Sequence, residues 1–122
     1  MEFESRQNDY VMKLDGNAKN GHGPKALLLA GLAGCSGIDV VDILKKMRVA
    51  FSSLEIETNA TQTDDHPKVF KEIRIIYKVA TEKKNEEKVK KAIELSLDKH
   101  CGVAAMLKKN SPITYTLEIH PV

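Results

Sequence analysis

The chain has 122 residues, of which 42% are hydrophobic and 30% are charged, and its formal net charge is +2. These values are typical of one soluble globular domain, and so small a charge argues against a nucleic-acid partner. With no Trp, three Phe and three Tyr, the chain also offers no aromatic platform for stacking bases.

The first elements predicted along the chain are a strand and a long helix. Apolar and polar residues alternate from Tyr10 to Leu14, and the turn dipeptide Asp15-Gly16 ends this pattern. Pro24 suits the first turn of a helix, and apolar residues follow helical spacing from Lys25 to Arg48. We therefore expect a strand, a loop and a helix that begins near Pro24.

The long helix is unusually apolar and rich in glycine. Its most apolar stretch, Ala26 to Ile38, is shorter than the ~20 residues that span a bilayer, so a buried helix is expected rather than a membrane anchor. Gly31, Gly34 and Gly37 share one face and would allow close approach of another backbone. That neighbour can belong to a second subunit.

The rest of the chain predicts two paired strands, two helices and a last strand. Alternation over Leu54 to Thr58 and over Ile73 to Val79 predicts a hairpin. An amphipathic helix is expected from its N-cap residue Asn85 to about Lys99, then a short helix at Val103 to Leu107 and a strand at Ile113 to Ile119. Since no strand-helix unit repeats, we expect a single α+β domain over residues 1–122 with mainly antiparallel pairing.

The two cysteines are the candidate chemical groups. Two cysteines cannot form a disulfide framework, and they can be catalytic, metal-binding or simply buried. Cys35 lies in the apolar helix, whereas Cys101 stands beside His100 at a helix junction, where amide N–H groups and an imidazole would favour a thiolate. No metal site is expected, because the possible ligands lack short paired spacing. Those ligands are His22, Cys35, His66, His100, Cys101 and His120.

Two longer motifs resemble one family. The run from Gly23 to Val41, GPKALLLAGLAGCSGIDVV, resembles the first-cysteine motif of the OsmC/Ohr family of thiol-dependent peroxidases, with proline at the same distance before the cysteine. The run from Leu95 to Leu107, LSLDKHCGVAAML, is similar to the segment that carries the family's second cysteine. Both motifs occur in the family's order, so the resemblance spans most of the chain.

The resemblance implies a fold and an activity. It implies antiparallel sheets wrapped around a long central helix that carries Cys35, in an intertwined homodimer. It also implies that Cys35 is the peroxidatic thiolate that reduces an organic hydroperoxide and that Cys101 resolves the resulting sulfenic acid as a disulfide. A small thiol or dithiol would reopen that disulfide, so no cofactor is expected. The role that the resemblance implies is oxidative stress defence. We expect the protein in the cytoplasm, because no secretory signal opens the sequence.

The chain departs from the family pattern near its amino end. The family's peroxidases carry a glutamate shortly after the motif proline, paired with an arginine, but here those positions are Lys25 and Ala26. Arg6 is the arginine that we carry over, and the first family strand is expected to be shortened or absent. Two alternatives therefore stay open. One is a weakly active or inactive dimer that binds a small apolar or thiol ligand or senses redox state, and the other is a dimer whose cysteines merely pack.

Overall fold

The computed structural model describes all 122 residues, which divide into two compact units, Met1–Gly31 and Leu32–Val122. The long helix α1 (Pro24–Lys46) begins in the first unit and continues into the second. The two units are described separately below. A single domain over the whole chain stays a prediction.

The first unit is built on a hairpin. Strands β1 (Glu2–Gln7) and β2 (Tyr10–Asp15) pair antiparallel, and Asn8 turns the chain between them with a positive φ of 55°. The strand β2 was predicted and β1 was not, and the prediction that the first family strand is shortened or absent stays untested. Alternation could not reveal β1 because Phe3 is its only apolar residue.

The loop after β2 is held by Asp15. Its carboxylate accepts backbone N–H bonds from Asn17 at 2.9 Å and Asn20 at 3.1 Å. A Cβ at Gly21 would lie 2.5 Å from the carbonyl oxygen of Lys13, so only glycine fits there. These contacts fix the loop that leads into α1.

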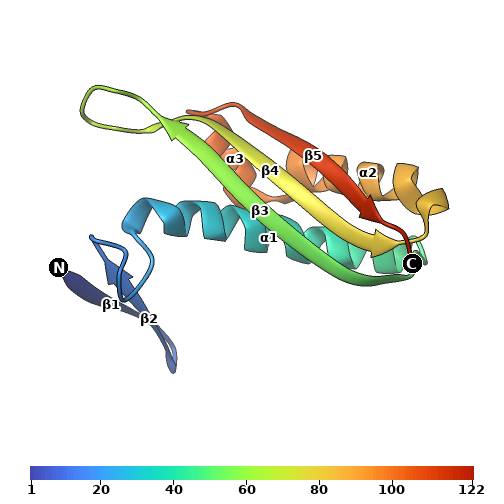
Figure 1. The fold of residues 1–122 in the computed structure, drawn as a ribbon, viewed down its shortest axis with the longest axis horizontal. Coiled ribbons are helices and arrows are strands. Elements are labelled where there is room, and N and C mark those ends of the chain that lie inside the picture. Colours follow the sequence, from blue (N-terminus) through green and yellow to red (C-terminus); the bar gives the residue numbers. More distant parts are fainter. The chain divides into compact units, whose positions relative to one another are not determined.

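The second unit contains a three-stranded sheet in the order β3-β4-β5 (Figure 1). Strands β3 (Phe51–Gln62) and β4 (Phe70–Thr81) form the predicted antiparallel hairpin. Strand β5 (Ile113–His120) pairs parallel with β4. The sheet is therefore mixed, because the helices between β4 and β5 carry the chain back to the start of β4, a return that strand-helix spacing alone did not reveal.

Helices cover one face of this sheet (Figure 1). After a 3₁₀ turn at Lys83–Asn85 come α2 (Glu86–Leu95), a π-helical turn at Ser96–His100 and α3 (Gly102–Lys108). Asn85 occupies the predicted N-cap position, but its side chain donates to Thr81 Oγ1 at 3.0 Å and caps no helix N–H. Side chains from β4, α1 and α2 share one core. Its fully buried members include Leu32, Val40, Leu44, Ile73, Ile75, Tyr77, Val79, Val89, Ala92 and Ile93.

The long helix is buried along one stripe only, contrary to the expectation of a buried helix. Leu32, Ser36, Val40 and Leu44 are buried, whereas Ile38 is 68% exposed. The helix α1 is also long enough and apolar enough to cross a membrane. Core helices of soluble proteins meet the same two criteria. The glycine face finds no neighbouring backbone in this chain. A Cβ at Gly31 or Gly34 would meet open space, and one at Gly37 would meet the Ile56 side chain at 3.1 Å.

The helix α1 ends slightly before the predicted Arg48. The Val49 N–H bonds to the Leu44 carbonyl at 2.9 Å and the Arg48 N–H to the Lys45 carbonyl at 3.0 Å, with Arg48 at a φ of 59°. This is a Schellman ending with arginine in the left-handed position that glycine usually takes. Because no glycine marks this position, the helix was predicted to end too late in the sequence.

Candidate active site

The structure brings both cysteines together with an aspartate. Cys35 and Asp39 lie one turn apart on α1, and Cys101 lies between the π-helical turn and α3. The two Sγ atoms and a carboxylate oxygen of Asp39 all lie within 4.8 Å of one another. Cys35 and Asp39 are half-buried and Cys101 is 3% exposed. Both cysteines are free thiols.

The π-helical turn aligns Ser96 and Cys101 with α1. The Cys101 N–H donates to the Ser96 carbonyl at 2.7 Å, which closes the wider turn. The predicted helix to Lys99 missed this change, since α2 is α-helical only to Leu95. Such turns occur often at functional sites because they redirect side chains without breaking the helix.

A buried chain of hydroxyl groups leads to Asp39. Ser96 Oγ donates to Asp39 Oδ2 at 3.1 Å, and Ser36 Oγ lies 2.9 Å from Ser96 Oγ and 2.6 Å from the Tyr77 hydroxyl. Each hydroxyl has one proton, so Ser36 donates to Ser96 and Tyr77 donates to Ser36. Burial, as the largest cause, raises the pKa of Tyr77 to about 12, which keeps this phenol a donor. The chain fixes the orientation of the Asp39 carboxylate.

Cys101 is a protected thiol. Burial raises its pKa to about 11, although a 3.4 Å bond from the Ala104 N–H acts in the opposite direction, and the neighbouring Cys35 and Asp39 raise it further. His100 is exposed and is not among the main causes of this shift. The Ala104 N–H does favour a thiolate at Cys101, as expected of an amide group, but desolvation is the larger effect and the pKa of Cys101 is raised.

The remaining candidates belong to the first unit. Arg6 is exposed on β1, and Lys25 and Ala26 are exposed in the first turn of α1, all in the first unit, whereas Cys35 belongs to the second. No histidine takes part in a cluster of three possible metal ligands. The proposed role of Arg6 stays a prediction.

Sequence reasoning missed Asp39, although a signal for it was present. Cys35 and Asp39 have the spacing that places two side chains on the same helix face. Asp39 lies close to Cys101 and accepts a hydrogen bond from Ser96, and both residues are distant from it in sequence. Only the fold shows these two contacts.

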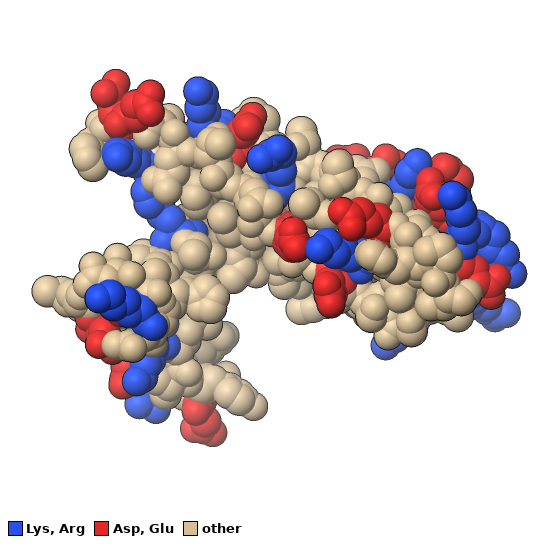
Figure 2. All heavy atoms as spheres, in the orientation of Figure 1, with Lys and Arg blue, Asp and Glu red and all other residues tan.

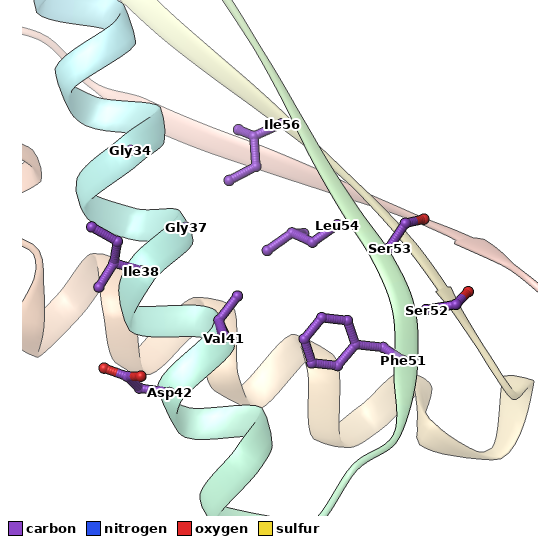
Figure 3. Close-up of a pocket in the computed structure, with 10 residues that line it drawn as sticks. All are labelled: Gly34, Gly37, Ile38, Val41, Asp42, Phe51, Ser52, Ser53, Leu54 and Ile56. Carbon is purple, nitrogen blue, oxygen red and sulfur yellow. The ribbon is translucent and has the colours of Figure 1, made fainter.

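An apolar groove of about 600 Å³ lies between α1 and β3 in the second unit. Phe51, Leu54 and Ile56 point from β3 toward α1, and Val41 points back toward them (Figure 3). Gly34 lines the groove next to Cys35 in the chain, although Cys35 itself is not part of the lining. The groove has the size of a small-molecule site.

The visible face of the molecule carries charged side chains of both signs. Figure 2 shows Lys and Arg side chains interspersed with Asp and Glu side chains on the visible face, without an extended basic region. This distribution agrees with the small net charge of +2.

The fold and the site define an α+β protein in which a thiol on the long helix lies close to a second thiol at the start of α3. The family model of OsmC-like proteins matches residues 16–116, and the chain belongs to this family. It is 33% identical over 107 residues to Protein YhfA of Escherichia coli K12, covering 87% of this chain and 80% of that protein.

Solved structures agree with this assignment. A hypothetical protein from Aquifex aeolicus VF5 superposes with a TM-score of 0.81 at 31% identity, covering 98% of this chain and 89% of that one. The organic hydroperoxide resistance protein OhrB of Bacillus subtilis shares the fold, with a TM-score of 0.61 at 18% identity and coverage of 98% and 96%. The predicted family and α+β class are thus confirmed.

Proposed function

We propose that this protein is a thiol-dependent peroxidase that reduces organic hydroperoxides through Cys35 and Cys101. One observation carries the proposal, namely that the Sγ atoms of the two motif cysteines lie within 4.8 Å of each other. An S–S bond of about 2.05 Å would require the two side chains to rotate toward each other. The name of the structurally similar OhrB supports the substrate class.

The reaction balances with two thiols and one hydroperoxide. The Cys35 thiolate attacks the distal oxygen, the O–O bond breaks, and the alkoxide leaves as an alcohol after taking a proton. The sulfenic acid on Cys35 is then attacked by the Cys101 thiolate, so that an S–S bond forms and hydroxide leaves as water. An external thiol or dithiol restores both thiols by exchange and is itself oxidised.

The surroundings of the two thiols support this division of roles. Cys35 is half-buried and so within reach of a substrate, whereas Cys101 is almost inaccessible and holds its proton because its pKa is raised to about 11. A thiol that stays protonated is a poor first nucleophile. Arg6 is the cation that we propose to stabilise the Cys35 thiolate in place of the family's arginine.

The groove between α1 and β3 would hold the organic part of the substrate. Its lining is mainly apolar and includes Gly34, which is next to Cys35 in the chain. The same groove favours a second candidate function, the binding of a small apolar ligand without turnover. Lys25 and Ala26, at the positions of the family's glutamate, support that candidate.

We also propose a homodimer. On α1, Ile38 is 68% exposed and Leu28 is 49% exposed. Nothing in the chain lies within 4 Å of a Cβ placed at Gly31 or Gly34. The hairpin β1-β2 likewise exposes Phe3 by 62% and Tyr10 by 81%. A two-stranded hairpin is marginally stable alone, and apolar faces of this kind are usually covered by a partner.

Intact mass after one equivalent of cumene hydroperoxide tests the peroxidase. We expect wild type to lose two hydrogens, Cys101→Ser to gain one oxygen that a sulfenic acid trap captures, and Cys35→Ser to stay unchanged. A dithiol should restore wild type and allow repeated turnover. If all three proteins stay unmodified, the peroxidase is excluded and ligand binding becomes the better interpretation.

Sedimentation velocity tests the dimer. Wild type should sediment with the mass of two chains, and Gly34→Arg should sediment as one chain, because a side chain there meets nothing within its own chain. Lys88→Glu, an exposed change on α2, serves as the control and should leave the dimer intact. A dimer that survives Gly34→Arg would show that this face of α1 is not the interface.

A further inference from the structure

Two thiols and a carboxylate converge on one point in the second unit, and no step of the peroxide reaction above uses the carboxylate. We propose that Cys35, Asp39 and Cys101 bind a thiophilic divalent cation, with Zn²⁺ as the best fit, and that this ion reversibly blocks the dithiol. The carboxylate is what separates this site from an ordinary cysteine pair.

The donor atoms are already near the positions that zinc requires. Zinc bonds of about 2.0–2.3 Å in a tetrahedron place neighbouring donors roughly 3.5–3.8 Å apart. The Cys35 Sγ, the Cys101 Sγ and the Asp39 oxygen lie within 4.8 Å of one another. Zinc binding would therefore draw the donors together by at most about 1.3 Å, which is on the scale of a side-chain movement.

Hydrogen bonds outside the cluster support the ligands. Ser96 Oγ donates to Asp39 Oδ2 at 3.1 Å, which leaves the other carboxylate oxygen for a metal. The Ala104 N–H donates to Cys101 Sγ at 3.4 Å, a contact that would stabilise a metal-bound thiolate. Cys35 and Asp39 are half-buried, so a fourth position stays accessible to water or a small ligand.

The chemistry of the donors selects the metal class. Thiolates favour zinc and similar soft or borderline ions over Mg²⁺ and Ca²⁺, which prefer all-oxygen sites. The Asp39 carboxylate disfavours the Cys101 thiolate in the absence of a cation, and its negative charge attracts a cation to the site. Binding releases the two thiol protons and leaves both sulfurs reduced, so affinity should rise with pH.

The bound ion would also block hydroperoxide reduction. The ion would hold both sulfurs as ligands, so that Cys35 could not react with the substrate. This blocking role rests on the proposed function. That the site binds zinc does not depend on the peroxidase. The expectation that peroxide chemistry needs no cofactor is unaffected, since the ion would act as an inhibitor.

The test is titration of the reduced protein with Zn²⁺ in competition with a chromophoric chelator, and with Co²⁺ followed by its thiolate charge-transfer absorption. Wild type should bind one ion. Cys35→Ser and Cys101→Ser should each weaken binding by on the order of 100-fold or more, and Asp39→Asn by about 10- to 100-fold. Asp42→Asn, an exposed aspartate on the same helix, is the matched control and should bind as wild type. Circular dichroism checks that each variant folds. Alkylation of wild type blocks both thiols without a mutation and should abolish binding in the same way.

The outcomes separate the two proposals. Absence of stoichiometric binding, or equal affinity in Asp39→Asn and wild type, overturns the three-ligand site. Binding with the expected ranking in a protein that never reacts with cumene hydroperoxide keeps the site and excludes the peroxidase. If the peroxidase works, one equivalent of Zn²⁺ should suppress Cys35 oxidation and a chelator should restore it. Oxidation at an unchanged rate in the zinc-loaded protein would overturn the blocking role.

Discussion

Disulfide closure after oxidation of Cys35 should accelerate about tenfold per pH unit, or roughly 100-fold between pH 6.5 and pH 8.5. The closing step needs the Cys101 thiolate, and burial raises the pKa of this thiol to about 11. Below that pKa the thiolate fraction grows tenfold with each pH unit. Oxidation of Cys35 removes one neighbour that raises this pKa, but burial, the largest cause, remains.

The measurement is a quenched time course in metal-free buffer. Protein is mixed with one equivalent of cumene hydroperoxide, a sulfenic acid trap is added at intervals, and intact mass gives the ratio of trapped product to disulfide. At low pH the trapped sulfenic acid should dominate, and at high pH the disulfide. Cys101→Ser is the control and should give trapped product at every pH. A closure rate that does not depend on pH would show that Cys101 is exposed or already ionised in the oxidised protein.

Most of the fold could be predicted from the sequence because its elements carry strong local signals. Pro24 marks the start of α1, and the alternation around Ile73 and Ile113 marks β4 and β5. The weak elements were the ones missed. Strand β1 has one apolar residue, and the parallel pairing of β5 with β4 is a property of the connection between them.

The site shows the same division. Cys35 and Cys101 could be found from their motifs, whereas Asp39 gains its meaning only when the π-helical turn brings Ser96 and Cys101 to α1. The sign of the pKa shift at Cys101 was also beyond the sequence. Adjacent residues suggested stabilising donors, but burial by residues distant in sequence is the larger effect.

Loss of the Ser36 hydroxyl should destabilise the protein more than loss of its partner on Tyr77. Ser36→Ala leaves the Tyr77 hydroxyl fully buried without its 2.6 Å partner, which should cost about 1–3 kcal/mol. Tyr77→Phe should cost only about 0.5–1.5 kcal/mol, because Ser36 keeps its bond to Ser96. An unsatisfied buried donor is worse than the absence of both groups.

The double variant makes this a test of sign. Adding Tyr77→Phe to Ser36→Ala removes the stranded hydroxyl and should recover part of the lost stability, so the double variant should be more stable than Ser36→Ala. Urea unfolding at one fixed protein concentration measures all three variants, since the stability of the proposed dimer would depend on concentration. Additive losses would mean that water reaches the Tyr77 hydroxyl. Recovery would establish that water does not reach the hydroxyl chain from Tyr77 to Asp39. This chain then holds the carboxylate beside the two thiols in one orientation.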